Sequence, residues 1–205
     1  FSDCVTQSYR VTVAACTLEQ LIRSESNITL LKEMDIVTPL TNVLRHHMAT
    51  AHITIPLCSV IGRLAVDEAM RNQMGQWGVC ELILKIIKDM KGRKSLQQTS
   101  SIVSLFGALL SLCKDSESNT YLVCEFDGVD LVIDSINQLD LNSKTETDVH
   151  CSSTIASFKS KDDADIDSGD IVILMLCALL ELLLGHTEGN VNAIKNNKSG
   201  ACDCM

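Results

Sequence analysis

Three histidines lie close together in the sequence, as metal ligands often do. His46 and His47 are adjacent, and His52 follows them in the next loop. A zinc site needs three or four converging ligands, and no cysteine or carboxylate stands immediately beside these residues to complete the set. The dipole of a helix favours a histidine near its C-terminal end, which is enough to explain His46 and His47. We therefore predict no metal site here, and no cofactor in the chain.

The acidic stretch 163–170 is a second candidate, because it resembles part of a calcium-binding loop. An EF-hand loop has glycine at its sixth position and glutamate at its twelfth. Here those positions hold Ser168 and Leu174, so no bidentate carboxylate closes the coordination shell. We interpret the stretch as a solvated acidic segment whose last residue, Asp170, caps the next helix.

No catalytic arrangement is evident elsewhere. The sequence contains no Ser–His–Asp set, phosphate-binding glycine loop or nucleophile elbow. Paired carboxylates such as Asp67 and Glu68 stand at helix ends, where solvation explains them. The net charge is −9 and no basic stripe is present, which argues against nucleic-acid binding, since that depends on neutralising phosphates. We predict that the chain is not an enzyme and binds neither nucleic acid nor a small-molecule substrate.

Two hydroxyl side chains have surroundings that suit an acidophilic protein kinase. Thr145 is followed by Glu-Thr-Asp, and Ser160 is followed by Lys-Asp-Asp. A phosphate on either residue would add charge to an already acidic segment. A freely varying loop without regulation is the alternative, and we favour it.

The chain around these residues is patterned for helices. Apolar residues make up 46% of it and aromatic residues 3%, and only two prolines occur. Leucine, isoleucine, valine and alanine recur at three- and four-residue spacing, whereas alternating β-branched runs are absent. We predict an all-α fold. One helix is expected at 55–66, with Thr54 as N-cap and Pro56 in its first turn, another at 170–185, and a short one at 190–196.

Cysteine usage and the apolar runs bear on location. Of the ten cysteines, six occupy apolar helical positions, which predicts reduced thiols packed in a core and an intracellular, cytoplasmic protein. These six are Cys16, Cys58, Cys80, Cys113, Cys124 and Cys177. The longest apolar run, 171–184, is too short to span a membrane and predicts a buried helix.

One sequence pattern recurs along the chain: an asparagine, a turn-forming residue before an aliphatic run, and then a longer helix. The asparagines are Asn27, Asn72, Asn119 and Asn190, at intervals of 45, 47 and 71 residues. Self-similarity at intervals of about 40–50 residues is typical of a stacked helical array. The pattern predicts that Gly78 and Gly128 stand at equivalent junctions between a short and a medium helix.

The stretch 60–72, Val-Ile-Gly-Arg-Leu-Ala-Val-Asp-Glu-Ala-Met-Arg-Asn, and its continuation from Trp77 resemble the armadillo repeat. The stretch 109–119 repeats the pattern, and Asp35 stands where a glycine is usual. The resemblance implies a right-handed α-solenoid of armadillo-like repeats, each with a short, a medium and a long helix. It divides the chain into an array over 1–138, a flexible acidic insert rich in serine and threonine over 139–169, and a continuation of the array over 170–205.

The resemblance also implies where a partner would bind. In armadillo-like folds the long helices line a concave groove, and one position near the end of each long helix often carries a ligand-binding asparagine. Aligning the chain with itself places Gln20, Arg63, Ser111 and Glu181 at this position, and Ser59 and Gly107 one turn earlier. The paired tryptophan and asparagine that bind nuclear-import peptides are absent from these positions.

The function implied is a non-enzymatic scaffold for protein–protein interaction, forming a segment of a larger intracellular protein. Other proteins would bind through the concave face or the ends of the array. Two alternatives stay open: a regulatory factor for a small GTPase or a motor protein, and a structural component of a ciliary or microtubule assembly. Recovery of a GTPase in one nucleotide state, or of tubulin, would discriminate between them.

Overall fold

The computed structural model describes residues 2–92, 99–144 and 168–199, and all regular elements within them are helices. The all-α prediction is therefore confirmed for the described residues. The helices are α1 (Ser2–Leu21), α2 (Glu25–Glu33), α3 (Val37–His46), α4 (Ala51–Leu64), α5 (Glu68–Gln76), α6 (Val79–Gly92), α7 (Thr99–Cys113), α8 (Glu117–Glu125), α9 (Gly128–Lys144) and α10 (Ser168–Ser199). None of these helices is both long enough and apolar enough to cross a membrane.

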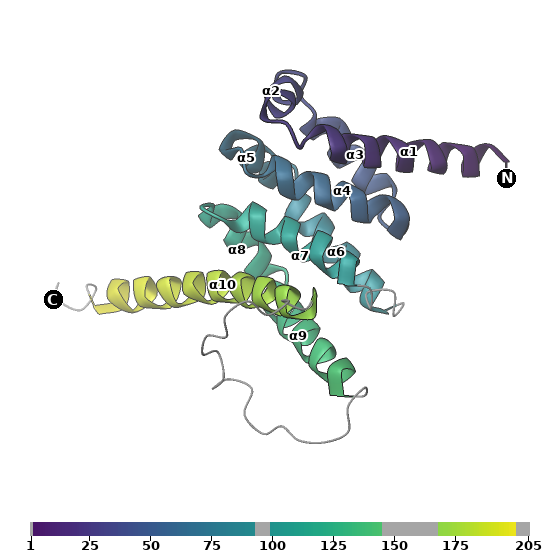
Figure 1. Cartoon of the computed structure of the whole chain (residues 1–205). Helices are drawn as coiled ribbons and strands as arrows, with labels where there is room; N and C mark the ends of the chain where they lie inside the picture. Colours follow the sequence, from purple (N-terminus) through teal and green to yellow (C-terminus); the bar gives the residue numbers. More distant parts are fainter. Residues whose placement is uncertain (1, 93–98, 145–167, 200–205) are drawn as a thin grey trace, which may run out of the picture.

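The order short, medium, long recurs three times after α1. We call these triplets unit 1 (α2, α3, α4), unit 2 (α5, α6, α7) and unit 3 (α8, α9, α10). Each short helix has nine residues, and the long helices have 14, 15 and 32. Figure 1 shows the units following one another through the molecule, from α2 at the top to α9 and α10 at the bottom.

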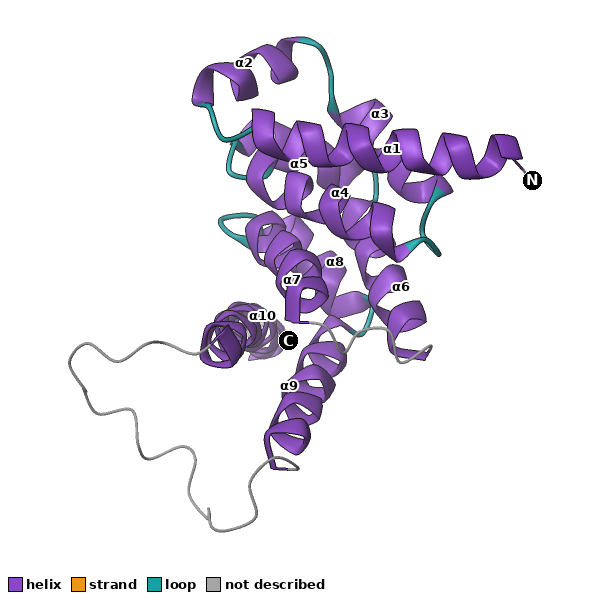
Figure 2. Ribbon diagram, turned by 45° about the vertical axis from the view of Figure 1, so that its right-hand side comes forward, coloured by secondary structure: helices purple, strands orange, loops and turns teal. Residues whose placement is uncertain are grey.

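Each class of helix packs on its counterpart in the neighbouring unit. The long helices form a ladder in which α4 packs against α1 and α7, and α7 packs against α10. The medium helices pack in the same order: α3 packs against α6, and α6 packs against α9 (Figure 2). Each later short helix packs on the medium helix of the preceding unit, α5 on α3 and α8 on α6. The apolar core runs between these layers, so each unit buries its residues against its neighbours.

The close approach of α4 and α7 depends on a glycine. A Cβ on Gly62 would lie 3.2 Å from the Cα of Ala108, so the two backbones nearly touch. A larger residue at either position would separate the helices.

The junction between the short and medium helices has the same geometry in all three units. Asp35, Gly78 and Asp127 follow the short helices and have positive φ angles of 50°, 74° and 63°. A left-handed residue ends a helix and redirects the chain. The predicted equivalence of Gly78 and Gly128 is wrong by one residue, because Asp127 holds the left-handed place. Gly128 is constrained for another reason, since a Cβ there would lie 2.5 Å from the carbonyl oxygen of Val123.

The two prolines affect helix boundaries in different ways. The medium helices α6 and α9 begin directly after the left-handed residue, whereas α3 begins one residue later, at Val37. Pro39 explains the delay, because it has no N–H to donate to the carbonyl of Asp35. Pro56 lies inside α4, which begins at Ala51 with Thr50 as N-cap. The predicted start at Ile55 with Thr54 as N-cap is therefore wrong.

The helices of unit 3 are longer than the sequence patterns predict. The α9 helix continues to Lys144, so residues 139–144, expected in the flexible insert, are helical. The α10 helix is continuous from Ser168 to Ser199, with no break at Gly185 and no separate helix at 190–196. The rest of the expected insert, 145–167, lies outside the described residues, as does the end of the chain from 200.

Candidate functional site

The predicted groove residues are distributed over all four helices of the long-helix ladder. Gln20 lies on α1, Ser59 and Arg63 on α4, Gly107 and Ser111 on α7, and Glu181 on α10. Gln20, Arg63 and Glu181 are exposed, whereas Ser59, Gly107 and Ser111 are half-buried. The structure therefore arranges them along a continuous row of packed helices and does not gather them into one pocket.

Two of these residues help to join adjacent ladder helices. The Ser59 hydroxyl donates a 2.6 Å hydrogen bond to the Glu19 carboxylate, which links α4 to α1. A Cβ on Gly107 would lie 3.5 Å from the sulfur of Met175, so α7 and α10 pack closely at this point. Sequence reasoning missed Glu19, although it stands directly beside Gln20.

Sequence reasoning also missed that the C-terminal part of the ladder is apolar on its exposed side. Val103 of α7 is 41% exposed, and on α10 the exposed fractions are 53% for Ile171, 50% for Leu174 and 44% for Leu184. Residues 171, 174, 178 and 181 follow helical spacing, so they share one face of α10. The run 171–184 was expected to form a buried helix, and this expectation is wrong for its exposed side. Within the run, only Val172, Leu176, Leu179 and Leu183 are buried.

Polar side chains at the start of the short helices cap the long helices before them. The Asn27 amide donates to the Leu21 carbonyl at 2.8 Å, and the Asn119 amide donates to the Leu112 carbonyl at 2.8 Å. In unit 2 the guanidinium of Arg71 is the capping group, and it donates to the Ala65 carbonyl at 3.1 Å. Cations and amide donors both satisfy the last carbonyls of a helix.

The predicted equivalence of Asn72 with Asn27 and Asn119 is therefore wrong. Asn72 is exposed and lines an open groove of about 360 Å³ between α5 and α8. Gly75, Gln76, Ser118, Asn119 and Leu122 line the same groove, and none of the predicted groove residues does.

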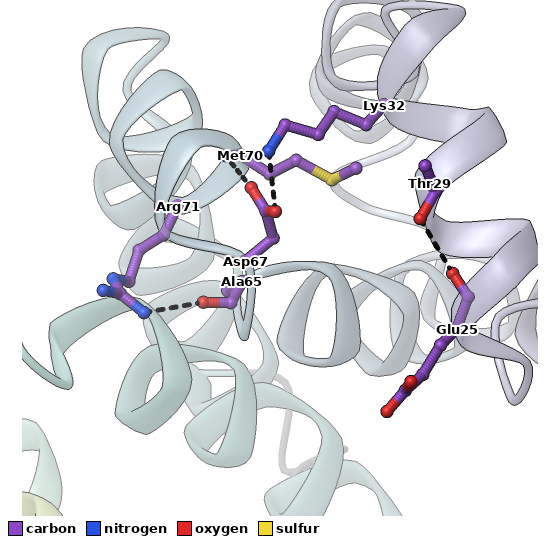
Figure 3. Close-up of polar contacts among 7 residues, drawn as sticks. All are labelled: Glu25, Thr29, Lys32, Ala65, Asp67, Met70 and Arg71. Atoms are coloured by element: carbon purple, nitrogen blue, oxygen red, sulfur yellow. Dashed lines mark hydrogen bonds and ion pairs between the residues drawn. The ribbon is translucent and has the colours of Figure 1, made fainter.

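Ion pairs and hydrogen bonds join the units outside the ladder, as Figure 3 shows for α2 and α5. The Lys32 ammonium of α2 lies 2.8 Å from the carboxylate of Asp67, which also accepts from the Met70 N–H as the N-cap of α5 (Figure 3). The hydrogen bond from Lys32 lowers the pKa of Asp67, and the bond from Met70 lowers it further. Asp67 thus has a structural role, consistent with its position at a helix end.

Residues considered as metal ligands or modification sites are placed as follows. His46 and His47 stand at the end of α3, with ring centroids 6.1 Å apart. Within the described residues, no group of three or more histidine, cysteine or acidic side chains could hold a metal ion. Thr145, Ser160 and residues 163–167 lie outside the described residues. Asp170 lies inside the first turn of α10, which begins at Ser168, so its predicted role as N-cap is wrong.

The six cysteines whose side chains the structure describes are free thiols, but they do not all pack in the core. Cys58, Cys80 and Cys113 are buried and Cys124 is half-buried, whereas Cys16 and Cys177 are exposed on the ladder. The prediction of a buried thiol is therefore wrong for these last two. Burial raises the pKa of Cys58 and Cys80 to about 12.

Thiol reactivity should separate the two groups of cysteines. At pH 8 we expect iodoacetamide to modify Cys16 and Cys177 first, with Cys58 and Cys80 slower by roughly 1,000-fold, because only the thiolate reacts and burial also blocks access. Peptide mass mapping over a time course measures each rate. Equal rates for Cys58 and Cys16 would contradict the packing of α4, and unfolding in urea should bring all four rates together.

No family model and no curated protein matches the chain. The long-helix ladder and its exposed face are therefore the features that point to a function.

Proposed function

We propose that this chain is a non-enzymatic scaffold for protein–protein interaction, built as a right-handed α-solenoid of armadillo-like repeats, which binds a partner along its long-helix ladder. Support for the architecture comes from the recurring order of short, medium and long helices and from the packing of each helix on its counterpart. Such stacks have extended surfaces that suit other macromolecules.

The observation that carries the proposal is the exposed apolar face of α7 and α10. Val103, Ile171 and Leu174 are each at least 41% exposed, on helices that pack side by side. Contiguous exposed apolar surface is typical of interaction sites, whereas single exposed apolar residues are ordinary. Arg63 of α4 and Glu181 of α10 are also exposed on the ladder helices, and they carry charges of opposite sign. The partner would place apolar residues against α10 and polar groups toward these two side chains.

Photocrosslinking tests this proposal. A photoreactive phenylalanine analogue replaces Glu181 on the ladder face or, as a control, the exposed Glu125 on α8. We expect a specific crosslinked partner from position 181 and none from position 125. Leu174→Glu should abolish the crosslink, because it puts a charge into the apolar face, whereas Ile133→Glu on α9 should leave it unchanged. Loss of the crosslink with both variants, or with neither, would contradict the assignment of the ladder face.

A further inference from the structure

The short helix α2 differs from its counterparts in how little of it is buried. No side chain of α2 is buried, whereas α5 buries Met70 and Met74, and α8 buries Asn119 and Val123. The contacts explain the difference: α5 packs on α3 and α8 packs on α6, each a medium helix of the preceding unit. No medium helix precedes α2 within the described residues, because α1 is a long helix.

A comparison of equivalent residues in the three units shows how much apolar surface stays exposed on α2 and at the end of α1. Counting back from the left-handed residue, Leu31 matches Met74 and Val123, which are fully buried, yet Leu31 is only half-buried. By the same count Leu21 matches Leu64 and Cys113, which are likewise the last residues of their long helices. The exposed fraction is 50% for Leu21, 0% for Leu64 and 1% for Cys113.

The same comparison holds at the end of the short helix. Met34, Trp77 and Phe126 are the C-cap residues of α2, α5 and α8, and their exposed fractions are 76%, 41% and 36%. Leu30, one turn before Met34, is 56% exposed. Leu21, Leu30, Leu31, Met34 and Asp35 thus form a surface with an apolar centre, which we call the α2 face.

Inside the molecule, the medium helix that covers such a surface brings a cation to a fixed place. Arg45 of α3 donates to the carbonyl of Trp77 at 3.4 Å. Lys88 of α6 donates to the carbonyl of Phe126 at 3.2 Å and to the carboxylate of Asp127 at 3.0 Å. Arg45 and Lys88 are equivalent, since each stands ten residues after the left-handed residue of its unit. A cation is favoured here because the C-terminal end of a helix is electronegative.

The corresponding acceptors on the α2 face are the carbonyl of Met34 and the carboxylate of Asp35. Asp35 accepts from Gln73 and Thr38, one on each oxygen, and stays exposed. Like Asp127, which binds Lys88, it has capacity for a further donor.

We propose that the α2 face binds an amphipathic helix that carries a lysine or arginine, in the manner in which α3 packs on α5 and α6 packs on α8. Its apolar side would cover Leu21, Leu30 and Met34, and its cation would reach the Met34 carbonyl and the Asp35 carboxylate. This inference deepens the proposed scaffold function, on which it rests, by assigning a second surface and the chemistry of its partner.

A second copy of this chain does not match this chemistry. Its unit 3 would have to supply α9, and the position equivalent to Arg45 and Lys88 is Asn137 in α9. An asparagine provides no charge, and Asp130 and Asp134 make α9 acidic near its exposed side. The charges therefore favour a basic helix over α9 of a second copy.

A peptide with the sequence of α6, residues 79–92 with Cys80→Ala, is the probe, because α6 already covers the equivalent surface on α8. We expect it to bind the intact chain, measured by fluorescence anisotropy, and to slow hydrogen exchange in α2. Leu30→Glu in the chain should weaken binding by about tenfold or more, since a charge would enter the apolar centre. Ile133→Glu, which alters an exposed isoleucine on α9, is the matched control and should not change the affinity. Circular dichroism checks that both variants fold.

The peptide's cation is tested separately. Lys88→Glu in the peptide should also weaken binding by about tenfold or more, and Asp35→Asn in the chain should lessen that difference. Equal binding of the two peptides, or no effect of Leu30→Glu, would overturn the proposal. Self-association of the chain that Leu30→Glu abolishes would overturn it in favour of a second copy. The photocrosslink at position 181 does not involve the α2 face, so it can fail or succeed independently.

Discussion

Replacing Gly75 by alanine is expected to destabilise the fold by about 3 kcal/mol, although the same change at most helical glycines is stabilising. A Cβ at Gly75 would lie 1.9 Å from the Oδ1 of Asn119, whose side chain is buried. Asn119 would have to move and lose its 2.8 Å bond to the Leu112 carbonyl, leaving buried polar groups without partners. For a chain of this size, thermal unfolding should show a midpoint lower by on the order of 10 °C.

Two further variants test whether the loss of stability comes from the contact between Gly75 and Asn119. Gly185→Ala is the control, because Gly185 is helical and a Cβ there meets no atom within 4 Å. It should raise stability by about 0.5–1 kcal/mol, as alanine does in an open helix. Combining Gly75→Ala with Asn119→Ala should cost clearly less than the sum of the single changes, since the two side chains compete for one space. Additive costs would contradict the contact between α5 and α8.

Phe106→Ala is expected to be about as damaging, with a loss of about 3–5 kcal/mol. Phe106 is completely buried in α7, the ladder helix that packs against both α4 and α10. Removing its ring leaves a cavity that neither neighbour can fill without shifting along the ladder. Chemical denaturation followed by circular dichroism gives the free energy of unfolding.

Val103→Ala is the matched control for Phe106→Ala, because it removes apolar atoms from the same helix on its exposed side. Its cost should stay within about 1 kcal/mol, as is usual for surface positions. If Val103→Ala cost as much as Phe106→Ala, the assignment of buried and exposed faces of α7 would be wrong.

The all-α fold could be predicted because helical spacing of apolar residues is a strong and local signal. The helix caps were harder to predict, because different side chains donate to the last carbonyls of the long helices. They are asparagines in units 1 and 3 (Asn27 and Asn119) and an arginine in unit 2 (Arg71). A pattern search for asparagine therefore selected Asn72, one residue away from the functional Arg71. Pro56 caused the wrong prediction of where α4 begins. A proline often marks the first turn of a helix, but it is tolerated inside a well-packed one.

The helix on which each candidate groove residue lies could be predicted, whereas the exposed apolar surface of α10 could not. The groove positions follow from the alignment of the units, which fixes the helix and the turn. Whether Ile171 or Leu174 is covered depends on which helices pack beside α10, and this is decided by tertiary contacts. For the same reason Cys16 and Cys177 have the sequence surroundings of core residues and yet are exposed.

The contacts between adjacent ladder helices also imply unequal mechanical stiffness. At the joint of α4 and α7, Gly62 brings the backbones into direct contact, and packed backbone has little freedom to yield. At the joint of α1 and α4, the hydrogen bond from Ser59 to Glu19 uses side chains that can rotate. Elastic deformation would therefore be easier at the joint of α1 and α4 than at the joint of α4 and α7, so a partner that spans both joints would change the angle of α1 first.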